Sequence, residues 1–72
     1  MEEKRYQLLL DKDQIPDSIL SDIKSDGALV LQPKYNFLTH SLYFTSNDIA
    51  VRKIRQKGYQ NIAECIETVP FC

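Results

Sequence analysis

Hydrophobic and polar residues alternate along several short stretches of this chain, which is the pattern of strands that bury one face. The clearest alternation runs from Tyr6 through Leu8 to Leu10. Residues 28–32 are instead almost wholly apolar, and Pro33 behind them cannot donate to a hydrogen-bonded ladder, so we expect a loop to begin there. The predicted strands lie near residues 5–10, 28–32, 39–45 and 62–69.

Two further stretches repeat their apolar residues every three or four positions, which predicts amphipathic helices. In the first, Ile19, Leu20 and Ile23 form one stripe, and Pro16 suits a first helical position that needs no amide hydrogen. Gly27 follows this helix in the sequence and predicts a turn that ends it. The predicted helices lie near residues 16–24 and 47–57.

The second helix has clear sequence signals at both ends. Residues 45–47 are three short polar side chains, each able to cap the first turn by accepting a backbone hydrogen bond. Gly58 can adopt the left-handed conformation that ends a helix. With Gly58 in that place, Ile54 and Tyr59 are the pair expected to make apolar contact at the ending.

The predicted order of elements is βαββαβ, and the whole chain, residues 1–72, is expected to form one small α+β domain. This order favours a four-stranded antiparallel sheet with both helices on one face, the ferredoxin-like plan. The sheet residues expected to face the helices are Tyr6, Leu8, Leu10, Leu42 and Phe44. The residues expected on the open face are Gln7, Leu9, Ser41, Tyr43 and Thr45.

The composition excludes several classes of protein. With 43% hydrophobic and 26% charged residues the chain is neither disordered nor fibrous, and a formal net charge of −1 argues against a general nucleic-acid or membrane-surface binder. No apolar run is long enough for a signal peptide or a membrane span. Cys65 and Cys72 would stand roughly 23 Å apart in an extended strand, so we expect reduced thiols in a cytoplasmic protein.

The residues that carry enzyme chemistry are present only singly. His40 has no cysteine or second histidine near it in sequence and is expected to be a hydrogen-bonded residue of the third strand. Glu64 and Glu67 would face opposite sides of one strand. Two glycines cannot build a phosphate-binding loop, and two thiols with one histidine are too few for a structural zinc site. We therefore predict no catalytic residue, no cofactor and no metal site, and a protein that is not an enzyme.

The expected loop after Pro33 contains two aromatic residues, Tyr35 and Phe37. Aromatic side chains offer large contact area at low entropic cost and are enriched at protein interfaces. The alternative is that one or both fold back to cap a small core. The sequence gives these two interpretations equal weight.

Tyr43 is the aromatic residue predicted for the open sheet face. RNA-recognition domains stack bases on such a face, but here the first strand offers Gln7 and Leu9 where a ring would be needed. Leu9 and Tyr43 could instead form the interface of a homodimer, since symmetric dimers are the commonest oligomers. The simplest interpretation is that both are partly buried by their neighbours.

A third candidate surface is the outward face of the second helix, formed by Ile49, Arg52, Lys53 and Gln56. Packing within the domain needs the opposite face, so an aliphatic residue among basic ones suits an acidic partner. The alternative is that the basic cluster of this helix, Arg52, Lys53, Arg55 and Lys57, neutralises the aspartates of the first helix and its flanks and satisfies the helix dipole.

These patterns together favour a small non-enzymatic interaction module, acting as a regulator, an inhibitor or an assembly subunit by binding protein. A weak nucleic-acid binder that uses the open sheet face and the basic helix is the alternative. The candidate partner-binding residues are Tyr35, Phe37, Tyr43, Ile49, Arg52, Lys53 and Gln56.

Overall fold

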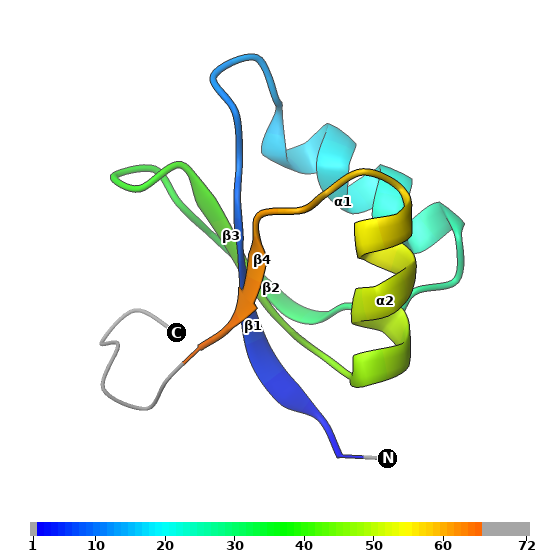
Figure 1. Ribbon diagram of the computed structural model, residues 1–72. Coiled ribbons are helices and arrows are strands. Elements are labelled where there is room, and N and C mark those ends of the chain that lie inside the picture. The colour runs from blue at the N-terminus through cyan, green and yellow to red at the C-terminus, as the bar shows by residue number, and fades with distance from the viewer. Residues whose placement is uncertain (1, 66–72) are drawn as a thin grey trace.

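The computed structural model describes residues 2–65, which form an α+β domain (Figure 1). Three long strands, one short strand and two helices follow one another in the predicted order βαββαβ. The elements are β1 (Lys4–Leu9), α1 (Pro16–Ser25), β2 (Leu31–Asn36), β3 (Ser41–Ser46), α2 (Asp48–Gln56) and β4 (Ile62–Glu64).

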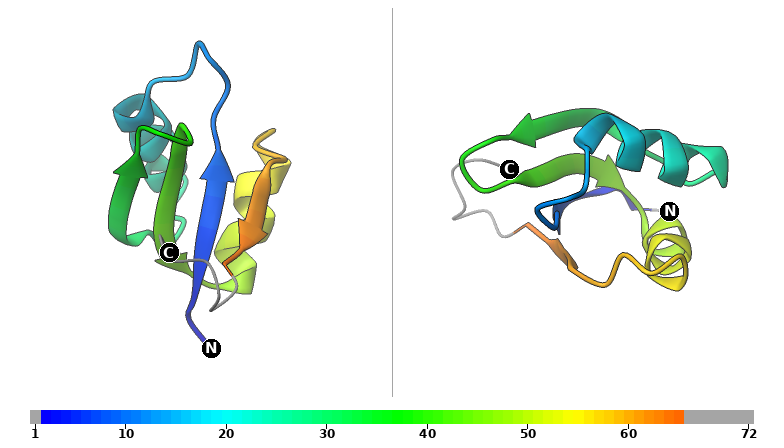
Figure 2. Two further views of the ribbon diagram at one scale, coloured as in Figure 1. Left: turned by 90° about the vertical axis from the view of Figure 1, so that its left-hand side faces the viewer. Right: turned by 90° about the horizontal axis from the view of Figure 1, so that it is seen from above.

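The four strands form one antiparallel sheet in the order β2-β3-β1-β4. Its two central strands, β1 and β3, pair along their full length, with Tyr6 opposite Phe44 and Leu8 opposite Leu42. Figure 2 shows the sheet face-on with both helices behind it, and from above with both helices on the same side. The prediction of a four-stranded antiparallel sheet with two helices is therefore confirmed.

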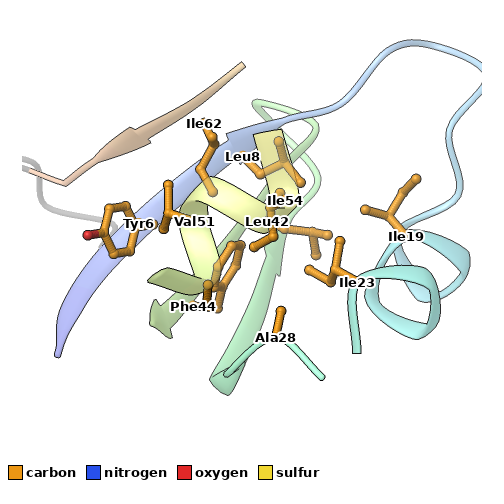
Figure 3. Close-up of a cluster of buried hydrophobic side chains, with 11 residues drawn as sticks. Tyr6, Leu8, Ile19, Ile23, Ala28, Leu42, Phe44, Val51, Ile54 and Ile62 are labelled. Carbon is orange, nitrogen blue, oxygen red and sulfur yellow. The ribbon is translucent and has the colours of Figure 1, made fainter. Parts of the chain in front are cut away.

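The hydrophobic core fills the space between the sheet and the two helices (Figure 3). Tyr6, Leu8, Leu42 and Phe44 line the helix-facing side of the sheet, as the alternation predicts. The helices close the core from the other side with Ile19, Ile23, Ala50, Val51 and Ile54. Periodicity alone therefore identified which face of each helix is buried.

The ends of α2 follow the signals in the sequence. Asn47 is the N-cap, and its side-chain Oδ1 accepts a hydrogen bond of 2.9 Å from the amide of Ala50. Gly58 has a φ of +114°, in the region open to glycine. The amide of Tyr59 donates to the carbonyl of Ile54 at 3.4 Å, which is the bond expected of this type of helix ending.

The second strand is the element that sequence patterning misplaced. Residues 28–32 were expected to be the strand and residues 33–37 a loop, whereas β2 covers Leu31–Asn36 and pairs with β3 as a hairpin. Ala28, in the connection before β2, is buried, and Leu29 and Val30 pack against the core, so this apolar run serves packing rather than pairing. The carbonyl of Leu29 accepts a hydrogen bond of 2.7 Å from the buried Ser46 hydroxyl.

Pro33 lies within β2 because this strand is at the edge of the sheet. An edge strand needs only half of its amide hydrogens for pairing, so proline is tolerated there. The ladder between β2 and β3 shifts register between Leu31 and Lys34, and Gln32 has a φ of +49° at this irregularity. A bulge of this kind with a proline also discourages another strand from adding to the free edge.

The predicted fourth strand is confirmed in part. Ile62 to Glu64 pair with β1, and Ile62 is buried, but Cys65 is no longer in the strand. The remainder of the predicted range, residues 66–69, lies outside the described residues.

Candidate binding surfaces

The turn between β2 and β3 holds the two most exposed large apolar side chains of the described residues. Phe37 is 76% exposed and Leu38 is 77% exposed. We call these two residues the hairpin tip. The alternative that Phe37 folds back to cap the core is therefore wrong. Leu38 had not been singled out, because an apolar residue between two predicted elements carries no periodic signal.

Short-range hydrogen bonds fix the backbone around the hairpin tip. The amide of Leu38 donates to Asn36 Oδ1 at 3.0 Å, and the hydroxyl of Ser41 donates to the carbonyl of Thr39 at 3.1 Å. Side chains of Asn and Ser stabilise turns by such bonds. The backbone of the hairpin tip is thus held by hydrogen bonds within the turn, although the side chains of Phe37 and Leu38 lie in solvent.

His40 ties the same turn to the segment between β1 and α1. Its Nε2 lies 2.7 Å from the carbonyl oxygen of Asp11, which can only accept, so Nε2 carries the proton and donates. In the neutral ring Nδ1 then accepts from the hydroxyl of Tyr35 at 2.7 Å. The carbonyl of His40 also accepts from the amide of Leu10 at 3.0 Å. The prediction of a hydrogen-bonded His40 is confirmed, but it lies in the turn rather than in the strand.

Tyr35 takes part in the hydrogen bonds of His40 and is less exposed than the hairpin tip. It lies in β2, not in a loop, and is 39% exposed. Its ring meets the ring of His40 edge-on, with centroids 5.8 Å apart. A substitution of Tyr35 would therefore disturb the turn itself, so Phe37 and Leu38 are the cleaner positions at which to test contact with a partner.

Tyr43 lies on the sheet face opposite the helices, as predicted, but it is only 2% exposed. Its hydroxyl oxygen accepts a hydrogen bond of 3.0 Å from Gln7 Nε2. Ser41, beside it in β3, is also buried, whereas Leu9 is about half exposed. The ring of Tyr43 is therefore not available in this structure to stack on a base or to form the centre of a dimer interface.

The predicted outward face of α2 is confirmed as a surface. Ile49 is 46% exposed, and Arg52, Lys53 and Gln56 are exposed as well. We call these four residues the outer face of α2. The opposite side of the helix carries the buried residues Ala50, Val51 and Ile54.

Neutralisation between the two helices is concentrated on one lysine. Lys57 is the residue that follows α2 in the chain. Its Nζ lies 2.9 Å from a carboxylate oxygen of Asp22 in α1 and 2.6 Å from one of Asp26. Tyr59 donates a hydrogen bond to the other oxygen of Asp22. Within residues 2–65, neither Arg52 nor Lys53 forms an ion pair. The expectation that the acidic residues of α1 neutralise the basic cluster therefore holds for Lys57 and fails for these two.

The contacts around Asp22 predict a pH dependence of stability. The hydrogen bond from Tyr59, and next that from Lys57, hold the pKa of the Asp22 carboxyl below its usual value. A carboxyl whose pKa is lower in the folded state stabilises the fold above its unfolded pKa, and this contribution is lost as the pH falls through the folded pKa. The free energy of unfolding should therefore fall below about pH 5 less steeply in Asp22→Asn than in the unchanged protein.

Urea denaturation at a series of pH values measures this effect. Asp13→Asn is the matched control, because Asp13 is exposed and makes no ion pair among residues 2–65. The control should keep the acid dependence of the unchanged protein. Equal pH slopes for Asp22→Asn and the unchanged protein would contradict the assignment.

Two grooves lie on either side of α2. The larger, of about 300 Å³, is lined by Tyr6, Asp48, Val51, Arg52, Arg55 and Glu64. In it the hydroxyl of Tyr6 donates to Asp48 Oδ1 at 3.2 Å, and burial, followed by this bond, raises the pKa of Tyr6. The smaller groove, of about 140 Å³, is lined by Gly27, Ala28, Leu29, Asn47, Ile49, Ala50 and Lys53.

The state of Cys65 corrects one expectation. Cys65 is disulfide-bonded. Cys72, the other cysteine of that expectation, lies outside the described residues. The prediction of reduced thiols is wrong for Cys65, because the distance argument assumed an extended strand and β4 ends at Glu64. The expectation of a cytoplasmic location rested partly on reduced thiols, and the bond at Cys65 removes that support.

The described part of the chain brings no group of three or more histidine, cysteine, aspartate or glutamate side chains together that could hold a metal ion. Within the same residues, neither helix has the length and apolar character needed to cross a membrane. Comparison of the chain with family models, with curated proteins and with solved structures finds no match. The candidate surfaces therefore rest on the geometry alone.

Proposed function

We propose that this chain is a small non-enzymatic protein-binding module that contacts its partner through the hairpin tip. It would serve as a regulator, an inhibitor or a subunit of an assembly. The observation that carries the proposal is the exposure of Phe37 and Leu38, both about three-quarters exposed, on a turn fixed by hydrogen bonds. Burying such a side chain against a partner contributes about 1.5–3 kcal/mol.

The anchoring of the turn supports a binding role for the tip. Ordering flexible loops and side chains is one of the main costs of association. A turn whose backbone is already held before the partner binds avoids part of this cost. His40 joins the turn to Asp11, and Asn36 closes the turn itself. The backbone that carries the two apolar side chains is thus held by hydrogen bonds.

We further propose that the domain follows the ferredoxin-like plan. The strand order β2-β3-β1-β4, the antiparallel neighbours and the helices on one side of the sheet support this assignment. The plan hosts many unrelated functions, so the proposal of protein binding rests on the hairpin tip and not on the fold.

Affinity capture with a paired variant tests the proposal. The unchanged protein and the double variant Phe37→Ser, Leu38→Ser are immobilised, and proteins bound from native extract are compared by quantitative mass spectrometry. We expect a partner that the double variant fails to retain. With that partner purified, the double variant should raise Kd about 30-fold or more, which corresponds to about 2 kcal/mol.

Ile15→Ser is the matched control, since Ile15 is also exposed but lies in the segment before α1. It should retain the partner as the unchanged protein does. A partner held equally by the double variant would contradict the assignment of the tip. Binding that disappears on nuclease treatment would point to nucleic acid instead. A dimer in light scattering that the double variant converts to monomer would identify the partner as a second copy of this chain.

A further inference from the structure

The outer face of α2 concentrates positive charge that forms no ion pair with the other described residues. Arg52 and Lys53 are exposed and, among the residues that the structure describes, lie within ion-pair distance of no carboxylate. Arg55, on the flank of the helix, donates from one guanidinium nitrogen to the carbonyl of Ile62 at 3.0 Å. The chain as a whole carries a formal charge of −1, so this cluster is a local feature of α2.

An apolar groove lies directly beside these charges. Ala28 and Leu29 of the connection before β2 form one wall, Ile49 and Ala50 of α2 form the other, and Lys53 also lines it. Its volume of about 140 Å³ is well below that of sites for drug-sized ligands, which start at about 300 Å³. The groove therefore suits a single side chain of a larger partner, with a cation next to it.

The chemistry complementary to this surface is an acidic peptide with an aliphatic residue. Carboxylates would pair with Arg52 and Lys53, while the aliphatic side chain would cover Ile49 and enter the groove. Nucleic acid fits less well, because single-stranded nucleic acid is bound by exposed aromatic rings, which the outer face of α2 lacks.

We propose that the outer face of α2 is a second binding surface, which takes an acidic peptide segment that places one aliphatic side chain in the groove beside Ile49. This surface is separate from the hairpin tip, since the β2–β3 turn and α2 project to opposite sides of the sheet in Figures 1 and 2. The two proposals therefore stand or fall independently.

Selection from a library of short random peptides, displayed on phage, tests this proposal with the full chain as the target. We expect the enriched peptides to combine two or more Asp or Glu residues with a neighbouring Leu, Ile or Val. Synthesised for fluorescence anisotropy, such a peptide should bind about tenfold more weakly to Arg52→Ser, Lys53→Ser, and by a similar factor to Ile49→Ser. The affinity should also fall as salt is raised, because exposed charges are screened.

Lys24→Ser, Lys34→Ser is the matched control, because it removes the same charge from exposed positions on α1 and β2. It should change the affinity less than about threefold, as distant exposed charges are largely screened. Circular dichroism establishes that each variant is folded before binding is compared.

Several results would overturn the proposal. One is a selection that enriches no peptide, or only peptides without carboxylates. Another is a selected peptide that binds the α2 variants as well as it binds the unchanged protein. Loss of binding in Phe37→Ser, Leu38→Ser with retention in the α2 variants would move the peptide site to the hairpin tip. Tighter binding of single-stranded DNA than of any selected peptide, with the same sensitivity to Arg52→Ser, Lys53→Ser, would make the surface a nucleic-acid site.

Discussion

Replacing Phe44 with alanine is expected to remove a large part of the folding stability of this domain. Phe44 is fully buried in the central strand β3, opposite Tyr6, and its ring lies between the sheet and the helices (Figure 3). Deleting a buried phenylalanine side chain costs about 3–5 kcal/mol, from lost burial and from the cavity that remains. A chain of this length has roughly 4–11 kcal/mol of stability in total, so the loss is a large part of it.

Urea denaturation followed by circular dichroism measures this loss against a matched substitution in the same chain. Phe37→Ala removes the same atoms from the hairpin tip, where they contact water, and should change the free energy of unfolding by less than about 0.5 kcal/mol. If the two variants lose equal stability, Phe37 packs on the domain in solution, and the proposed role of the hairpin tip fails with it.

The helices could be predicted from sequence because their signals are local. Asn47 and Gly58 at the ends of α2 act on residues within one turn, so their effect does not depend on the rest of the fold. The apolar face of α2 follows from periodicity in the same way. The outward position of Ile49 was therefore visible before the structure was known.

The position of β2 could not be predicted, because it depends on a neighbour that is distant in sequence. The apolar run Ala28–Leu31 fits a buried strand and a packed connection equally well, and periodicity cannot separate the two. The deciding contact comes from β3, where Ser46 bonds to the carbonyl of Leu29. Pro33 is compatible with a strand only at a sheet edge, and the sequence does not state which strand is the edge.

For the candidate surfaces too, features that depend on neighbouring residues in the sequence could be predicted, and features that depend on distant residues could not. The outer face of α2 was predicted because helical geometry fixes which residues share a face. Tyr43 was expected to be partly buried, but its almost complete burial was not predicted, because alternation assigns a residue to one side of a sheet without stating how exposed that side is. The exposure of Phe37 and Leu38 arises from a turn held by His40 and Asp11, which are 29 residues apart.

The two proposed surfaces differ in what they offer to a partner. The hairpin tip provides apolar area on a fixed turn, and its binding should depend weakly on salt. The outer face of α2 provides charge with a small apolar groove, and its binding should depend strongly on salt. Salt dependence therefore distinguishes the surfaces with the unchanged protein, before any substitution is made.

Ile54→Ala should destabilise the fold far more than Ile49→Ala, although both change the same residue type on the same helix. Ile54 is fully buried in the core, so its truncation should cost about 2–5 kcal/mol. Ile49 is half exposed on the outer face, and the higher helix propensity of alanine offsets part of the small loss there, so the change should stay within about 0.5 kcal/mol.

Thermal unfolding distinguishes the pair directly. For a domain of this size each kcal/mol shifts Tm by about 4–8 °C, so Ile54→Ala should lower Tm by about 10 °C or more while Ile49→Ala leaves it nearly unchanged. A substantial loss in Ile49→Ala would mean that this residue packs within the domain, and its exposed part could not then serve a partner. When the peptide affinity of Ile49→Ala is measured as well, weaker binding by this variant at unchanged stability can only come from the surface itself.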